Sequence, residues 1–169
     1  MLKQPVRIEG KIENVIYRSA ESGYAVAEAL LDDGDEVVIT GTMPFLGSGE
    51  RISALGEYVN HPKHGMQFAV SSYSRTMPET VSGIYDYLAS GTIKGIGPKT
   101  AKQIVQRFGK GTFEMLATES EKLCEIKGIS KSKAEEIGQN FRMLNTMKLI
   151  MDFLSFYKLP AYISAALYR

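Results

Sequence analysis

The sequence predicts an α+β protein with two domains, a small β-barrel followed by an all-α domain. Short segments with alternating apolar residues fill residues 6–75, helical apolar spacing replaces the alternation after Pro78, and one segment recurs 33 positions later in the chain. The 169 residues are 44% hydrophobic, which is enough to bury a core in each of two small domains. We therefore place the barrel at residues 1–76 and the helical domain at residues 77–169.

The two halves of the chain differ in charge, although the formal net charge is only +1. Residues 1–78 carry seven Lys/Arg and ten Asp/Glu, a balance of −3, whereas residues 79–169 carry thirteen and nine, a balance of +4. A polyanionic partner is therefore expected on the second half. Because the chain has neither a long apolar run nor a signal peptide, we expect a cytoplasmic protein with no membrane partner.

Five strands are predicted in the first domain. Residues 6–17 and 24–31 surround a glycine-containing turn and should form a hairpin. Further strands are expected at 37–40, 51–59 and 67–73, each bounded by turn residues. Five short strands in about 70 residues are typical of a Greek-key barrel of the OB type, and an SH3-like barrel has nearly the same pattern.

Helices are expected from residue 79 onward, where apolar residues recur three and four positions apart. The predicted helices cover residues 79–90, 98–108, 112–117, 119–126, 131–144, 146–157 and 160–169.

The chain stops at Arg169 inside an apolar segment without a capping signal, so we expect it to be a fragment of a longer protein.

The repeated segment is the most informative feature of the sequence. It reads IKGIGPKTA at residues 93–101 and IKGISKSKA at residues 126–134, and each copy joins two predicted helices through a tight glycine turn. This arrangement resembles the helix-hairpin-helix motif, present here as a tandem pair over about residues 84–142. A degenerate third copy from Tyr157 and an ordinary helix after Pro160 are equally consistent with the last residues.

The chemistry of these turns favours nucleic-acid binding. Glycine lets backbone N–H groups approach an anion, and the helix that follows adds free amides and a favourable dipole. Lysines in the first turn of that helix oppose the dipole unless an anion is present. Such contacts reach the sugar-phosphate backbone, so binding should be independent of base sequence and sensitive to salt. The predicted DNA-backbone contacts are Gly95, Ile96, Gly97, Lys99, Thr100, Gly128, Ile129, Ser130, Lys131 and Lys133.

The two turns are not identical, and a single turn of this kind is more often only a connection between helices. The second copy and its lysines favour the DNA-binding interpretation over the purely structural one. Ser130 stands where the first copy has its second glycine, so we expect the second turn to have less backbone freedom and to hold phosphate more weakly.

No catalytic group of residues is recognisable. The segment 109–112 is the nearest match to a P-loop, but it lacks the Ser/Thr after lysine, and no aspartate of the kind used by DNA glycosylases lies between residues 86 and 152. His61 and His64 are interpreted as a surface pair in a loop, and Cys124 as a small apolar residue packed in a helix. We therefore expect no catalytic residues, no metal site and no cofactor in this chain.

The order of a barrel and tandem hairpins resembles two bacterial families. One comprises the RuvA-like Holliday-junction proteins, and the other is the N-terminal region of RecD-like DNA helicases, the long relatives of the exodeoxyribonuclease V alpha subunit. The segments GKIENVIYR at 10–18, ITGTMP at 39–44, HPKHGMQF at 61–68 and YLASGTIKGIGPKTA at 87–101 are similar to the second family. This similarity runs over nearly the whole chain.

The second resemblance implies a non-catalytic, DNA-binding accessory region of an ATP-dependent helicase that moves 5′ to 3′ in DNA repair and recombination. ATP, magnesium and the motor domains would belong to the sequence beyond Arg169. The hairpins would hold the backbone of single-stranded, forked or duplex DNA. The RuvA-like alternative implies a tetramer that binds four-way junctions, and a third hypothesis is a protein-interaction module whose hairpins no longer bind DNA.

Two roles stay open for the barrel. OB barrels often stack bases on aromatic side chains, whereas the acidic charge of this half favours aromatics that form the core and an outer face that contacts a protein partner. The candidate stacking residues are Tyr17, Tyr24, Tyr58, Phe68 and Tyr73.

Overall fold

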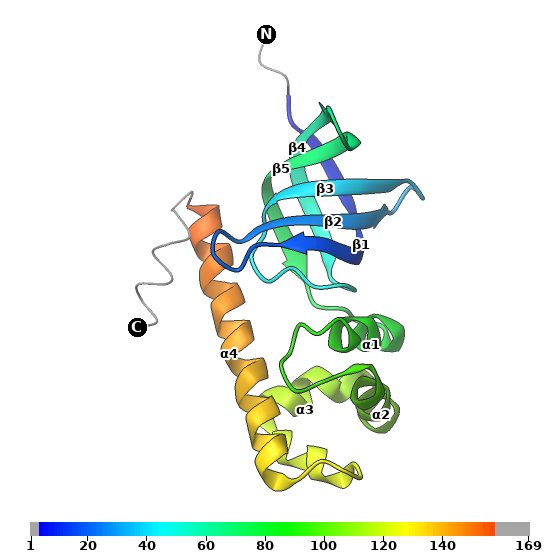
Figure 1. Cartoon of the computed structure of the whole chain (residues 1–169), viewed down its shortest axis with the longest axis vertical. Helices are drawn as coiled ribbons and strands as arrows, with labels where there is room; N and C mark the ends of the chain where they lie inside the picture. The colour runs from blue at the N-terminus through cyan, green and yellow to red at the C-terminus, as the bar shows by residue number, and fades with distance from the viewer. Residues whose placement is uncertain (1–3, 158–169) are drawn as a thin grey trace. The chain divides into compact units, whose positions relative to one another are not determined.

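A computed structural model describes residues 4–157, which divide into two compact units. The first unit contains residues 4–77 and 150–157, and the second contains residues 78–149. Figure 1 labels the strands and helices of both units. The domain limits drawn from the sequence stay a prediction.

The first unit is built on a closed barrel of five strands (Figure 1). They follow the order β1-β2-β3-β5-β4, in which β4 returns to pair antiparallel with β1 and β3 lies parallel to β5. A five-stranded Greek-key barrel of this kind confirms the predicted OB-like fold. The strands are β1 (Val6–Arg18), β2 (Tyr24–Leu31), β3 (Glu36–Thr42), β4 (Arg51–His61) and β5 (Gly65–Thr76).

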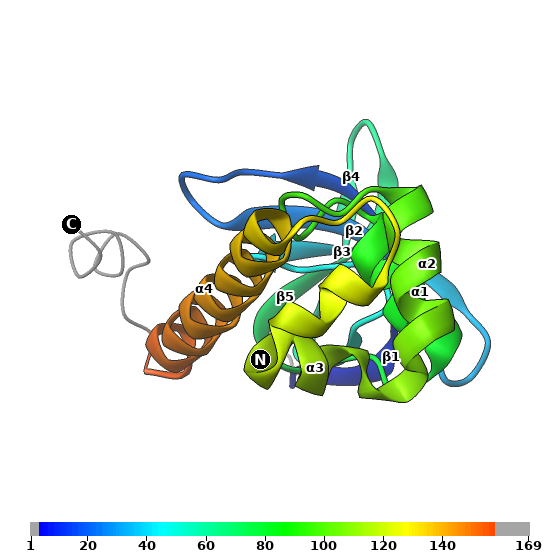
Figure 2. The same ribbon diagram turned by 90° about the horizontal axis from the view of Figure 1, so that it is seen from below.

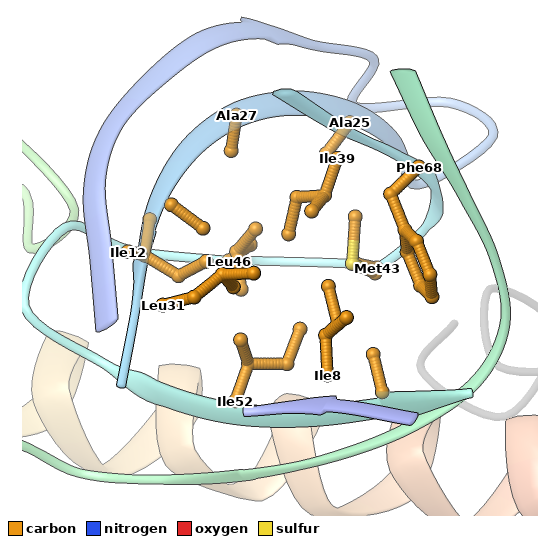
Figure 3. Close-up of a cluster of buried hydrophobic side chains, with 12 residues drawn as sticks. Ile8, Ile12, Ala25, Ala27, Leu31, Ile39, Met43, Leu46, Ile52 and Phe68 are labelled. Carbon is orange, nitrogen blue, oxygen red and sulfur yellow. The ribbon is translucent and has the colours of Figure 1, made fainter. Parts of the chain in front are cut away.

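Successive side chains of a strand point to opposite faces of the sheet, so one set of side chains points into the barrel and forms its core (Figure 3). In β2, for example, Ala25, Ala27 and Ala29 are buried while the residues between them are exposed or half-buried. Two glycines let strands approach closely, since a Cβ at Gly10 or Gly56 would overlap the backbone of the neighbouring strand. The other main core residues are Ile8, Ile12, Leu31, Ile39, Met43, Leu46, Ile52, Ala54 and Phe68.

The second unit is helical, as the change in spacing predicts, and in Figure 2 its helices α1 and α2 lie side by side. Its core contains apolar residues from all four α-helices, among them Tyr87, Ile104, Leu116, Ile137 and Phe141. The elements are α1 (Val81–Ala89), α2 (Pro98–Phe108), the 3₁₀ helix η1 (Gly109–Gly111), α3 (Thr112–Thr118), the 3₁₀ helix η2 (Ser120–Glu125) and α4 (Lys131–Phe156).

The predicted break in the last helix is wrong. α4 continues through Asn145 and Thr146, where the sequence suggested separate helices at 131–144 and 146–157. Both residues have only modest helix propensity, but the Thr146 hydroxyl donates to the Arg142 carbonyl at 2.9 Å and leaves the backbone helical. The segment predicted as a helix at 119–126 is a 3₁₀ helix, and the helix expected at 160–169 lies outside the described residues.

The last turns of α4 belong to the first unit and contact β5 there. The Arg75 guanidinium donates to both carboxylate oxygens of Asp152, at 3.2 and 2.9 Å, and to the Pro44 carbonyl at 2.6 Å. The Tyr73 hydroxyl also donates to Asp152, at 3.1 Å. Burial raises the pKa of Tyr73 above its usual value, and the carboxylates of Asp152 and Glu50 contribute to the increase. Among the described residues, no helix is both long and apolar enough to cross a bilayer.

Candidate nucleic-acid interface

The first hairpin turn connects α1 to α2 in the way the sequence predicts. The Ile96 amide donates to the Ile93 carbonyl at 3.3 Å, and Gly95 between them has φ +100°, a conformation that other residues rarely adopt. Ile93 and Ile96 are almost fully buried, so they fix the turn against the helices. Gly97 then precedes Pro98, the first residue of α2, and is exposed.

The second turn repeats this geometry between η2 and α4. The Ile129 amide donates to the Ile126 carbonyl at 3.2 Å, and Gly128 has φ +93°. Ile126 is buried, Ile129 is half-buried, and Gly128 is exposed. Apart from its two chain neighbours, no residue within 4–157 has an atom within 4 Å of the place where a Gly128 Cβ would stand. The repeat in the sequence therefore corresponds to a repeat in backbone conformation.

Ser130 changes the second turn in a different way from the one the sequence suggested. Its counterpart Gly97 has φ −97° and ψ 177°, an extended conformation that any residue can adopt, so serine loses no necessary backbone freedom. The Ser130 hydroxyl instead accepts from the Lys133 amide at 3.1 Å, whereas α2 has no side-chain cap. The second turn thus has one fewer free helix amide than the first.

Free amides and cations lie together at the start of both helices. In the described part of the chain, the N–H groups of Lys99 and Thr100 have no acceptor, because the first intrahelical bond of α2 is the one from Ala101 to Gly97. Lys99 and Lys131 are exposed and form no ion pair with any described residue. Such lysines are unfavourable at a helix N-terminus unless an anion binds there.

Lys133 lies near the first turn, although its place in the sequence assigns it to the second. A Cβ built on Gly95 would stand 3.6 Å from the Lys133 Nζ and 3.3 Å from Ile137. The Asn140 side chain of the same helix donates to the Lys94 carbonyl at 3.0 Å. α4 therefore holds the first turn and adds an ammonium group beside it.

Lys94 and Lys127 are further lysines at the turns, in addition to the contacts predicted from the sequence. Each lysine directly precedes the positive-φ glycine of its turn and is exposed. The signal was present, because lysine occupies the same place in both copies of the repeat.

The barrel offers fewer stacking residues than the sequence suggested. Tyr17, Tyr24 and Tyr58 are 54%, 41% and 44% exposed, so their rings are accessible. Phe68 is a correction, because its side chain is fully buried in the barrel core and packs edge-on against Tyr58 with the ring centres 5.1 Å apart. Tyr73 is also unsuited to stacking, since it is half-buried against the barrel core and its hydroxyl is bound to Asp152.

The residues considered for metal binding or catalysis occupy ordinary structural positions. His61 and His64 are exposed and stack on each other at the β4–β5 turn, where His61 Nδ1 accepts the amides of Lys63 and His64. Cys124 is exposed, which corrects the expectation that it packs as an apolar residue. Among residues 4–157 no group of three or more His, Cys, Asp or Glu side chains is arranged to hold a metal ion.

Comparison with known proteins agrees with both halves of the fold. Residues 5–78 match the family model of the OB-fold domain of the ATP-dependent DNA helicase YrrC, and residues 87–139 match that of the SAM-like helix-hairpin-helix tandem. No solved structure matches the chain significantly.

A curated relative links the two domains in one protein. The chain is 31% identical over 137 residues to the ATP-dependent RecD2 DNA helicase of Deinococcus radiodurans. The match covers 76% of this chain but only 19% of the relative, so the chain spans about a fifth of that helicase. The barrel, the hairpin tandem and this relative together support the resemblance of the chain to the N-terminal region of RecD-like DNA helicases.

Proposed function

We propose that the chain is a non-catalytic DNA-binding accessory region of a longer ATP-dependent helicase that moves 5′ to 3′ in DNA repair and recombination. The observation that carries this proposal is the pair of turns, each followed by helix amides without an acceptor and by exposed lysines without a counterion among the described residues. Phosphate oxygens provide both the acceptor and the counterion.

The hairpins bind the sugar-phosphate backbone and make no contact with the base edges that carry sequence information. The groups at the turns are backbone amides and lysines, and neither kind of group distinguishes one base pair from another in this arrangement. Affinity therefore comes mainly from counterion release, with a Kd of about 10⁻⁴ to 10⁻⁶ M at physiological salt. A weak and general contact of this kind suits a region that accompanies a motor along DNA.

ATP and magnesium belong, in this proposal, to motor domains outside the present chain. The hairpins direct the strand or the fork toward that motor. The comparisons favour this role over the RuvA-like alternative, because the matching barrel model describes a domain of a DNA helicase and the matching relative is a DNA helicase.

The experiment that tests the proposal replaces Lys99 and Lys131 together with alanine and measures duplex binding over a range of salt concentrations. If each lysine neutralises one phosphate, affinity falls and the slope of log K against log salt decreases by about 1.8. The matched control replaces Lys63 and Lys110, which are exposed outside the hairpin turns, and should leave the slope nearly unchanged. An unchanged slope in the Lys99 and Lys131 variant would remove the hairpins from the account.

A further inference from the structure

The outer face of strands β1, β2 and β3 carries a mixture of apolar and acidic side chains. On β2 the outward residues are Tyr24, Val26, Glu28 and Leu30, which alternate with the buried alanines. Tyr24 and Leu30 are 41% and 39% exposed. Large apolar side chains grouped on one strand face are a feature of surfaces that bind a partner.

The neighbouring strands continue this face. Glu28 pairs with Val38 and Leu30 with Glu36 across the β2–β3 ladder, and Tyr17 of β1 lies opposite Val26. Tyr17 is 54% exposed, and Val38 is half-buried. The ladder hydrogen bonds of β2 are used on both sides by β1 and β3, so a partner would contact side chains and could not add a strand.

The charge of the β2–β3 hairpin is entirely negative. Of the five acids, Asp32 is bound to Arg51 of β4 by two hydrogen bonds of 2.9 and 2.8 Å, and the other four have no ion pair with any described residue. Residues 24–42 contain no lysine or arginine and five acids, Glu28, Asp32, Asp33, Asp35 and Glu36.

This distribution of charge excludes a nucleic-acid backbone as the natural ligand of the face. Backbone binding needs Lys or Arg side chains that replace counterions at the phosphates, and the hairpin supplies only carboxylates. Lys11 of β1 stands opposite Leu30, and its ammonium group lies 3.8 Å from the Glu13 carboxylate, so this cation has an acidic partner on its own strand. A groove on the same face is lined by Glu13, Glu28, Glu36 and the apolar side chains of β3.

We propose that the outer face of β1, β2 and β3 is a docking surface for a basic and apolar segment of a protein partner. Apolar side chains of that segment cover Tyr24, Val26 and Leu30, and its Lys or Arg side chains meet Glu28 and Glu36. Charge complementarity selects this partner, because a neutral apolar segment would leave the carboxylates desolvated without a cation. The barrel then contributes protein binding while the hairpins contribute DNA binding.

A defined peptide tests the surface directly. The probe is a short peptide that alternates lysine with valine, added to the whole chain while backbone amide signals are followed by NMR. We expect shifts concentrated in β2 and β3, and affinity about tenfold lower for a peptide that alternates lysine with serine. Equal affinity for the two peptides would overturn the proposal, since simple charge attraction would then explain the binding.

Two charge-reversal variants provide the matched comparison. Replacing Glu28 and Glu36 with lysine should weaken binding of the lysine–valine peptide about tenfold or more, whereas Glu57→Lys with Glu79→Lys makes the same change of charge elsewhere and should alter it less than about twofold. Equal losses in both variants would contradict a defined surface.

A third experiment adds oligothymidine to the whole chain and follows the same backbone amide signals by NMR. Shifts of the Tyr17 and Tyr24 amides on its addition would identify the face as a base-stacking site and overturn the proposal. Shifts limited to the hairpin amides support it and leave the proposed function intact, so the two proposals can fail separately.

Discussion

The hairpin turns themselves, residues 93–97 and 126–130, differ only at their last residue, and exchanging the residues there tests how the turns bind phosphate. Gly97 and Ser130 stand in equivalent places before α2 and α4, but only Ser130 caps its helix. The Lys133 amide cannot donate fully to both the serine hydroxyl and a phosphate. We therefore expect Gly97→Ser to stabilise the fold and weaken DNA binding, and Ser130→Gly to do the reverse.

The expected magnitudes follow from the local geometry. Apart from the two chain neighbours of Gly97, no described residue has an atom within 4 Å of the place where a Cβ would stand, so the serine side chain fits without strain. A serine at the N-cap stabilises the helix by about 0.3 kcal/mol more than glycine does, which raises the unfolding midpoint of a chain of this size by about 1 °C. An amide withdrawn from a phosphate at an exposed turn costs about 1 kcal/mol of binding free energy, or about fivefold in Kd.

The assay combines thermal unfolding with fluorescence anisotropy of a labelled DNA duplex at one fixed salt concentration. Gly111→Ser is the matched control, because Gly111 precedes α3 without a side-chain cap and lies outside the hairpins. This control should leave DNA affinity unchanged. The reasoning would be refuted if Gly97→Ser bound DNA as tightly as the unmodified chain, or if both exchanges shifted affinity in the same direction.

The remaining predictions concern cation placement and packing. The ammonium group of Lys133 lies beside the first turn, so Lys133 and Lys99 should neutralise the same phosphate. Replacing both should therefore lower the salt slope for duplex binding by about 0.9, which is half the decrease expected for Lys99 with Lys131. Equal decreases would place the Lys133 side chain at the second turn. Gly138→Ala should destabilise the chain by about 1–2 kcal/mol in denaturant unfolding, since its methyl group would overlap a serine side chain of η2; an unchanged midpoint would contradict that packing. Arg75→Met should cost about 3–5 kcal/mol, because it removes the buried guanidinium that pairs with the buried Glu50 carboxylate and with Asp152; a loss below about 1 kcal/mol would show that water or another group compensates for that guanidinium.

The sequence predicted the barrel and the hairpins because local signals determine both. Alternating apolar residues define the strands, and the positive-φ glycines Gly95 and Gly128 mark the turns. The repeat made the second turn recognisable even though its last glycine is replaced by Ser130. What these features share is that neighbouring residues specify them.

The features that the sequence did not predict depend on contacts between distant residues. The backbone of Lys133 lies at the second turn, as its sequence position predicts, but the packing of α4 against the first hairpin brings its ammonium group beside Gly95. Phe68 looks like a stacking residue until the strand register directs it into the core. The contact between Arg75 and Asp152 joins residues 77 positions apart and has no local signature.

The continuity of α4 illustrates the same limit. Asn145 and Thr146 weaken the helical pattern locally, so the sequence suggests two helices. Packing on both sides of this point, by Phe141 and Leu154, keeps one helix instead. Tertiary contacts thus outweigh a modest difference in propensity.

The central claim is that helix amides at the two hairpin turns contact DNA phosphates. Backbone amide NMR of the whole chain, titrated with two duplexes of unrelated sequence, tests it most directly. We predict that the signals of Lys99, Thr100, Lys131 and Ser132 shift alike with both duplexes and return as salt is added. Shifts confined to the barrel, or different sets of shifted signals for the two sequences, would contradict it.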